Sequence, residues 1–319
     1  MKNRICNLLN ITYPLIQGGM AWAATAELAA AVSNAGGLGL IGSGAMTAEL
    51  LRPQIQRARQ LTDRSFGVNI MLMNPAAAEL AQLLIDEHVP VVTTGAGSPG
   101  KFIDAWHEAG LIVVPVVASA GQAKRMENLG ADAVVCEGQE AGGHIGELSS
   151  VVLWNAVAQA VGIPVIGAGG IADGRGIAAA FTLGCEGVQL GTRFLASTEC
   201  WVNQNYKNLV VKAKDIDTVV TGRSGGHPVR ALKTKLEREI LKLEKNGATF
   251  EELEAISVGS LRKAVMDGDL NEGSFMAGQS AGLINDIRPC AEIIPALFKE
   301  AGQVLSQTDT AYQAWSEQL

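Results

Sequence analysis

Apolar runs rich in β-branched residues recur every twenty to thirty positions along the first 194 residues of the chain. The segments between these runs have helical patterns of apolar and polar residues. Eight alternations of this kind favour a (β/α)8 barrel of parallel strands, in the α/β class, over an open sheet. We expect strands over residues 13–16, 38–41, 67–71, 89–93, 112–117, 133–136, 165–166 and 188–190, and helices over 26–35, 47–61, 76–87, 100–109, 120–129, 148–161 and 173–183.

The stretch from 163 to 194 contains the last two expected barrel strands, and both strand ends are rich in glycine. Gly169 and Gly170 follow the first strand, and Gly191 and Thr192 follow the second. Backbone N–H groups that no side chain obstructs can hold a phosphate, most readily at a helix start. In a (β/α)8 barrel a phosphate site lies after strands 7 and 8, where this stretch falls. The neighbouring Arg193 is expected to pair either with that phosphate or with a carboxylate.

The other expected strand ends are also polar or glycine-rich, at the face where barrels keep their chemistry. Such loops predict a long ligand that lies across the barrel mouth. Asn69 and Glu137 are either ligand contacts or loop caps. Residues 137–146 carry His144 between glycines, so a group that can donate or accept a proton near neutral pH can approach a ligand closely.

After residue 194 the strand–helix alternation stops. Patterns over 198–217, 231–246 and 250–267 are typical of helices and predict a mostly helical insertion, the lid, over residues 200–272. Residues 273–282 are small and apolar, which indicates a return to the ligand, and Gln279 among them predicts a ligand contact. Met20 and Met276 are either ligand contacts or core filler. Residues 289–319 are expected to form a final helix packed on the barrel. The predicted domains are a barrel (1–199 and 273–319) and the lid (200–272).

Composition narrows the class of function. The 319 residues exceed the roughly 250 that one barrel needs, which leaves room for the lid. A net charge of −7 without a basic block argues against nucleic acid. No secretory h-region precedes the first strand, and the longest apolar run, 111–118, is too short for a bilayer, so we expect a cytoplasmic protein without membrane contact. Five cysteines without a CxxC pair and four scattered histidines predict no metal site.

Eight motifs distributed over the whole chain carry a family resemblance. The sequence resembles the flavin-dependent enoyl-ACP reductase II family, FabK, within a larger group of FMN barrels that includes nitronate monooxygenase, once called 2-nitropropane dioxygenase. The glycine motifs are shared across that group, whereas the lid segment and MAGQSAG look closer to the reductase. The motifs are QGGMAW (17–22), AGGLG (35–39), FGVN (66–69), TTGAG (93–97), EAGGHIG (140–146), GAGGIADG (167–174), GTRF (191–194) and MAGQSAG (276–282).

The resemblance implies an FMN-dependent enzyme of type II fatty-acid biosynthesis that reduces the 2,3 double bond of trans-2-enoyl thioesters on acyl carrier protein with NADH or NADPH. It also implies a homodimer and stimulation by monovalent cations. His144 would be the catalytic proton donor near the flavin. The residues implied to bind FMN are Gly169, Gly170, Gly191 and Thr192 at the phosphate, and Gly18, Gly19, Met20, Asn69, Glu137, Gly142, Gly143, Met276, Gln279 and Ser280 along the rest of the cofactor.

Two alternative functions stay open. The first is nitronate monooxygenase, in which His144 takes a proton from a nitroalkane, oxygen accepts the electrons and no added nicotinamide is required. The second is a non-catalytic flavin-binding scaffold, because barrels host many functions. His227, in a glycine-rich turn of the lid, contacts either substrate or nothing.

Overall fold

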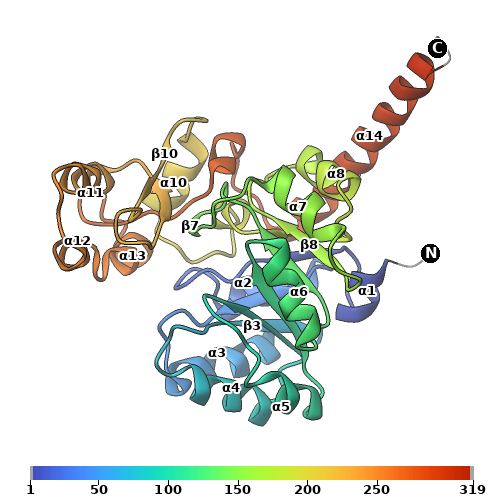
Figure 1. Cartoon of the computed structure of the whole chain (residues 1–319), viewed down its shortest axis with the longest axis horizontal. Coiled ribbons are helices and arrows are strands. Elements are labelled where there is room, and N and C mark those ends of the chain that lie inside the picture. The colour runs from blue at the N-terminus through green and yellow to red at the C-terminus, as the bar shows by residue number, and fades with distance from the viewer. Residues whose placement is uncertain (1–2, 317–319) are drawn as a thin grey trace.

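The computed structural model describes residues 3–316, and its centre is a barrel of eight parallel strands (Figure 1). The strands are hydrogen-bonded in the order β1-β9-β8-β6-β5-β4-β3-β2. Bonds from Gln17 N to Leu38 O (2.9 Å) and from Leu38 N to Leu15 O (2.8 Å) join β1 to β2 and close the ring. The barrel strands are β1 (Leu15–Gln17), β2 (Gly39–Gly42), β3 (Phe66–Met71), β4 (Val91–Gly95), β5 (Ile112–Val117), β6 (Val134–Glu137), β8 (Val165–Ala168) and β9 (Gly187–Leu190).

Helices cover the outside of this barrel, as the alternating pattern predicts. Each helix buries one face; in α3, for example, Leu51, Ile55 and Ala58 recur at helical spacing and are buried. The TIM-barrel prediction is therefore confirmed, and every expected barrel strand agrees with the structure to within two residues at each end. The covering helices are α2 (Ala26–Asn34), α3 (Ala48–Leu61), α4 (Ala77–Asp86), α5 (Ile103–Glu108), α6 (Ala120–Asn128), α7 (Ser150–Ala158), α8 (Gly174–Thr182) and the short α9 (Thr192–Leu195).

The inside of the barrel is filled from its N-terminal end. Helix α1 (Arg4–Leu9) contributes two buried side chains to a cluster of branched residues from the strands. The barrel is thus a packed core rather than a pore, and loops at the C-terminal ends of the strands remain the place for a ligand. Members of this inner cluster include Ile5, Leu9, Ile16, Leu40, Val114, Val135 and Ile166.

The lid segment differs most from the sequence prediction, because it contains an antiparallel hairpin as well as helices. Strands β10 (Thr218–Thr221) and β11 (Val229–Leu232) form this hairpin, which the sequence reading missed. The helix predicted over 198–217 is wrong at both ends, and the one predicted over 231–246 starts only after β11. The helical parts are α10 (Gln204–Lys212), α11 (Lys235–Lys245), α12 (Phe250–Ser257), α13 (Ser260–Arg262) and the π-helical turn η1 (Lys263–Asp267).

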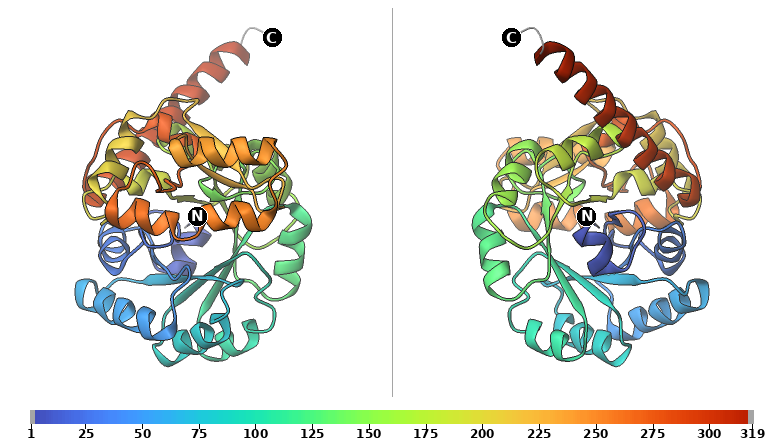
Figure 2. Two further views of the ribbon diagram at one scale, coloured as in Figure 1. Left: turned by 90° about the vertical axis from the view of Figure 1, so that its left-hand side faces the viewer. Right: turned by 90° about the vertical axis from the view of Figure 1, so that its right-hand side faces the viewer.

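The hairpin connects the lid to the barrel. Strand β11 also pairs with β7 (Gly143–His144), a two-residue strand in the loop after β6. The lid therefore lies at the C-terminal end of the barrel strands, in front of the barrel in the left view of Figure 2. The bounds predicted for the two domains stay a prediction.

The chain returns through the 3-10 helix η2 (Gln279–Leu283) and ends in the long helix α14 (Cys290–Ser316). The first part of α14 packs against the barrel with Ile293, Ile294, Leu297 and Ala301 buried, as predicted. Beyond Ala301 the helix runs outward from the body (Figures 1 and 2). Residues 317–319 of the predicted final helix lie outside the described residues.

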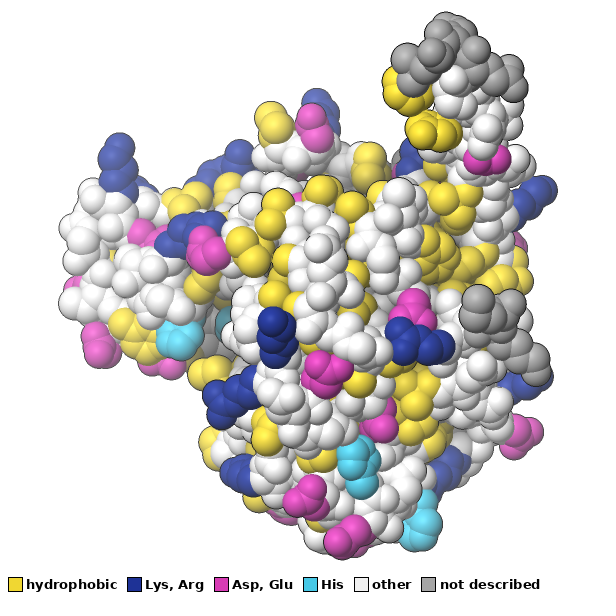
Figure 3. Space-filling view, turned by 45° about the vertical axis from the view of Figure 1, so that its right-hand side comes forward, with side chains coloured by type: hydrophobic (Ala, Val, Ile, Leu, Met, Phe, Trp, Pro, Cys, Tyr) yellow, Lys and Arg dark blue, Asp and Glu magenta, His cyan; other side chains and the backbone are white. Residues whose placement is uncertain are grey.

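Within residues 3–316, no helix is both long and apolar enough to cross a membrane. On the outer face shown in Figure 3, acidic and basic side chains are interspersed rather than segregated. That face therefore offers no basic surface of the kind that attracts a polyanion.

Candidate functional site

The ends of β8 and β9 form a cradle of bare backbone N–H groups. The two strands are paired in parallel, so their C-terminal ends lie at the same end of the sheet. Gly169 and Gly170 have φ of 92° and 78°, in the left-handed region that favours glycine. Among residues 3–316, the N–H groups of Gly169, Gly170, Gly191 and Thr192 find no hydrogen-bond acceptor. Unpaired donors at two neighbouring strand ends suit an anion such as phosphate.

Three other donors near the cradle are already paired. At the start of α8, Gly176 N donates to Asp173 (3.0 Å), and Gly174 N donates to Glu300 of α14 (2.8 Å). Arg193 Nη1 donates to the carboxylate of Asp286 at 2.8 Å, and Nη2 donates to the Asp286 carbonyl at 2.9 Å. Of the two partners considered for Arg193, the structure shows the carboxylate. The donors of the cradle are therefore backbone groups.

Residues 276–280 close the cradle from the side of the returning chain. The hydroxyl of buried Thr192 accepts from Gly278 N at 2.9 Å. Gly142 packs so closely here that a Cβ would lie 2.6 Å from Ala277 C. This contact explains why the loop after β6 needs glycine at this point. The returning chain over 273–282 thus packs against the loops after β6 and β9, and its predicted contact with the ligand stays a prediction.

The two predicted methionines flank the glycines of the site. Met20 Sδ lies 3.7 Å from the Cβ position of Gly191, and Met276 Sδ lies 3.7 Å from that of Gly143. Both side chains are half-buried, which suits a contact with a bound ligand as well as packing.

The remaining predicted side chains differ in their surroundings. Asn69 Nδ2 donates to Thr93 Oγ1 at 2.9 Å, and Gly19 packs on Asn69, where a Cβ would lie 2.3 Å from the Asn69 Cβ. Ser280 is buried, whereas Gln279 is exposed, and its backbone N–H donates to Glu140 O at 2.9 Å. Contact of these residues with FMN stays a prediction.

Two ionisable groups in the loop after β6 have shifted pKa values. Burial raises the pKa of the Glu137 carboxyl to about 7, and the described residues give that carboxyl no hydrogen bond. Partial burial, and then repulsion from His227, lower the pKa of the His144 imidazole. Near pH 7 Glu137 is divided between its neutral and ionised forms, and His144 is mostly neutral. The two groups can therefore exchange protons with a ligand near neutral pH.

Side chains of the lid reach two barrel loops, the one after β6 and the one after β1. Arg230 of β11 donates to Gln139 O, and the Arg262 guanidinium lies 5.9 Å from the centre of the Trp22 ring. Trp22 has φ of 64°, a strained value for a residue other than glycine. The sequence reading missed these contacts. The β-branched run at 218–221, followed by the glycine-rich turn at 222–228, was the signal that predicts the hairpin behind Arg230.

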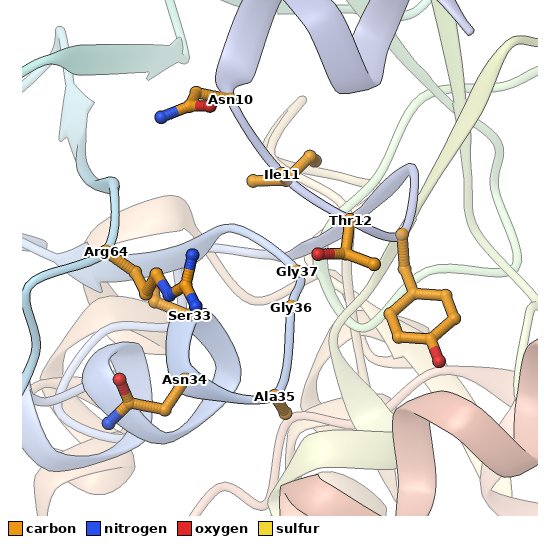
Figure 4. A pocket seen from close by; sticks show the side chains of 10 residues that line it. Asn10, Ile11, Thr12, Ser33, Asn34, Ala35, Gly36, Gly37 and Arg64 are labelled. Atoms are coloured by element: carbon orange, nitrogen blue, oxygen red, sulfur yellow. The ribbon is translucent and has the colours of Figure 1, made fainter. Parts of the chain in front are cut away.

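A pocket of about 160 Å³ opens at the opposite end of the barrel (Figure 4). It lies beside the N-terminal ends of β1 and β2, where a TIM barrel carries stability rather than catalysis. No residue predicted for the site lines it, so the chemistry belongs to the other end. Its lining consists of Asn10, Ile11, Thr12, Tyr13, Ser33, Asn34, Ala35, Gly36, Gly37 and Arg64.

The barrel and the unpaired backbone N–H groups at its mouth define the class, a TIM barrel with a glycine-rich backbone cradle after its last two strands. The sequence profile of the nitronate monooxygenase family matches residues 2–84 and 80–300. A probable nitronate monooxygenase from Staphylococcus aureus is 31% identical, over 95% of this chain and 98% of that protein. A (3aS,4S,5R,7aS)-5-hydroxy-7a-methyl-1-oxo-octahydro-1H-indene-4-carboxyl-CoA dehydrogenase from Mycobacterium tuberculosis is 33% identical, over 94% of this chain and 96% of that protein.

The chain belongs to the nitronate monooxygenase family of FMN-dependent oxidoreductases. Among solved structures, FabK from Thermotoga maritima is 53% identical, with a TM-score of 0.94, and the match covers 98% of this chain and 99% of the FabK chain. The resemblance that the motifs carry is thereby confirmed, and the chain is an oxidoreductase and a flavoprotein by family.

Proposed function

We propose that this protein is an FMN-dependent enoyl-[acyl-carrier-protein] reductase. It reduces the 2,3 double bond of a trans-2-enoyl thioester, consumes NAD(P)H and one proton, and releases NAD(P)+ and the saturated thioester. The observation that carries the proposal is the 53% identity to FabK along nearly the whole chain, lid included, against 31–33% for relatives with other activities. By the same resemblance we propose a cytoplasmic homodimer of type II fatty-acid biosynthesis, stimulated by monovalent cations.

The residues of the mouth fit FMN. Four unpaired N–H groups, at Gly169, Gly170, Gly191 and Thr192, would hold its phosphate. Bound FMN supplies the two-electron transfer from the nicotinamide to the double bond. The residues that would surround the rest of the cofactor are Gly18, Gly19, Met20, Asn69, Glu137, Gly142, Gly143, Met276, Gln279 and Ser280.

His144 would deliver the proton that the α-carbon of the thioester takes up, directly or through a water that it orients. Its lowered pKa makes the protonated imidazole a stronger acid than an ordinary histidine, and the neutral form then regains a proton from solvent. The lid, held to the His144 loop through β11, would cover the acyl chain and exclude water during the reaction.

Nitronate monooxygenase is the second candidate, favoured by the family profile and by the relative from Staphylococcus aureus. In that reaction His144 would instead accept a proton from a small nitroalkane. Its lowered pKa keeps it neutral near pH 7, the form that can accept a proton.

Oxidation of NADH and NADPH with crotonyl-CoA, compared with oxygen uptake on propyl-2-nitronate, separates the two candidates. The proposal predicts rapid, crotonyl-dependent nicotinamide oxidation and no nitronate-dependent oxygen uptake. The reverse pattern would establish the monooxygenase instead.

His144→Ala should lower kcat by a factor of about 100 or more, with FMN retained, because general acid catalysis contributes factors of this size. His107→Gln is the matched control, since His107 bonds Asp132 at 3.1 Å outside the mouth. Unchanged turnover of His144→Ala would remove the proposed role of His144.

A further inference from the structure

The loop over residues 137–146, which carries His144, is held from the lid by one buried arginine. Arg230 lies on β11 and is only 6% exposed. Its Nε and Nη2 donate to Gln139 O at 3.2 and 3.1 Å. Its Nη1 donates to Thr218 Oγ1, on the neighbouring strand β10, at 3.2 Å. The guanidinium therefore connects the base of the His144 loop to both strands of the lid hairpin.

The backbone of the same strand pairs with the strand that carries the histidine. In the β11–β7 ladder, Arg230 stands opposite Gly143, and Val229 stands opposite His144. Next to them, Ile145 N donates to the carbonyl of residue 228 at 3.1 Å. Because β7 has only two residues, this ladder contributes few hydrogen bonds of its own. The side chain of Arg230 thus adds two hydrogen bonds between lid and loop to those of the ladder.

Glu140 supplies a matching charge on the loop. Its carboxylate accepts from Ser150 N (3.0 Å) and Ser150 Oγ (2.8 Å) at the start of α7. Burial lowers the pKa of Arg230, and the Glu140 carboxylate partly opposes that effect. The guanidinium stays charged because the ordinary pKa of arginine is far above neutral pH. A buried charge inside a network of satisfied hydrogen bonds holds a fixed position. The His144 loop is therefore bonded to the lid at Gln139, through Arg230, and to α7 at Glu140, through Ser150.

We propose that Arg230 is a positioning residue that transmits the placement of the lid to His144. It acts through Gln139 and Gly143 and needs no contact with substrate. Its catalytic consequence rests on the proposed function, because there His144 must reach the α-carbon of the thioester. A misplacement of about 1 Å in an acid–base group can lower turnover about 100-fold, even when binding is kept.

Two substitutions of Arg230 test this role. Arg230→Met keeps most of the side-chain volume and removes every donor. Arg230→Lys keeps the charge, but a single ammonium cannot reproduce the planar fork to both acceptors. We expect Arg230→Met to lower kcat for crotonyl-CoA about 100-fold, with KM changed less than about threefold. Arg230→Lys should recover about tenfold of that loss. In both variants the rate at which NADH bleaches the flavin should stay within about twofold of the native rate.

Arg223→Met is the matched control, because Arg223 also joins the lid to the barrel, at Glu147 just after this loop, but does so on the surface. Its Nη1 lies 3.0 Å from Glu147 Oε1, and the two side chains are 48% and 74% exposed. An exposed ion pair of this kind contributes little, so kcat should stay within about twofold of native. A loss as large as that of Arg230→Met would overturn the specific role of Arg230.

Amide exchange of Ile145, followed by NMR, gives a readout that needs no substrate. Exchange should be at least about tenfold faster in Arg230→Met than in the native protein and unchanged in Arg223→Met. Native-like exchange, or faster exchange with kcat within twofold of native, would overturn the inference. If the native protein does not reduce enoyl thioesters, the proposed function fails, while the exchange comparison still decides whether Arg230 holds the loop.

Thr218→Val keeps the test open should Arg230→Met not fold. It removes only the acceptor of Nη1 and leaves both bonds to Gln139. Its effects should be smaller than those of Arg230→Met, with kcat about three- to tenfold lower and Ile145 amide exchange measurably faster than in the native protein. Native values of both quantities in a folded Thr218→Val protein would contradict the role.

Discussion

Thr192→Val tests the link between the phosphate cradle and the returning chain. The Thr192 side chain is buried, and its hydroxyl is the acceptor for the buried N–H of Gly278 at 2.9 Å. Valine has nearly the same shape, so the packing is kept while the acceptor is lost. The Gly278 N–H is then left without a partner away from water, which costs about 1–3 kcal/mol of folding free energy.

That cost should appear as a lower melting temperature. With an unfolding entropy of about 2.1 cal/mol/K per residue, a chain of 319 residues loses about 1.5 °C of Tm per kcal/mol, so a fall of about 1.5–4.5 °C is expected. Thr192→Ser is the control, since it keeps the hydroxyl and loses one buried methyl, worth about 1 kcal/mol. Calorimetry measures Tm, and amide exchange at Gly278 separates the two variants. It should quicken in the valine variant and stay protected in the serine variant.

The reasoning would be refuted by a valine variant with native Tm and a Gly278 amide as protected as in the native protein. That result would mean that the bond is not formed in solution or that water replaces it without cost. A loss of FMN binding in Thr192→Val with native Tm would indicate a role of the hydroxyl in the cradle itself.

Two further substitutions address the loop after β6. The folded pKa of Glu137, about 7, lies above its ordinary value of 4.5, so the native state binds this proton more tightly and the folding stability falls as pH rises through that window. Glu137→Gln should therefore flatten the fall in Tm of the apoprotein between pH 5 and 7. A curve of Tm against pH that runs parallel to the native one would contradict the shift. Gly142→Ala should weaken FMN binding at least about tenfold, measured by flavin fluorescence, because the added Cβ would lie 2.6 Å from Ala277 C. Gly302→Ala is the control and should bind FMN normally, because Gly302 lies in an exposed part of α14 with open space around it. Native FMN affinity in both variants would contradict the expected clash.

The barrel was predictable because its strands are locally distinctive. The run at 112–117 is apolar and, except for Pro115, β-branched, and β5 has the predicted bounds. The lid hairpin was not predictable to the same degree. Each of its strands has only four residues, and the strongly periodic charged helix that follows dominates the pattern from 231 onward. The pairing of β11 with β7 is a tertiary contact, which local periodicity does not report.

The candidate site was partly predictable for a similar reason. The glycines after β8 and β9 predict a backbone cradle, because in a (β/α)8 barrel the position of a loop in the sequence determines its position around the barrel mouth. The partner of Arg193 was open, because Asp286 lies 93 positions away in sequence. Arg230 was missed, because only the folded hairpin brings it to Gln139. Contacts between residues far apart in sequence depend on how the folded elements pair, which local composition does not reveal.

Anaerobic mixing of the yellow protein with NADH or NADPH, followed by crotonyl-CoA, tests the central claim most directly. The flavin absorbance should bleach with the nicotinamide and recover when the enoyl thioester is added, which shows both halves of the reductase reaction in one trace. A flavin that bleaches but recovers only when air is admitted would contradict the enoyl reductase. A flavin that neither nicotinamide bleaches would contradict it as well and would direct the search to nitronates.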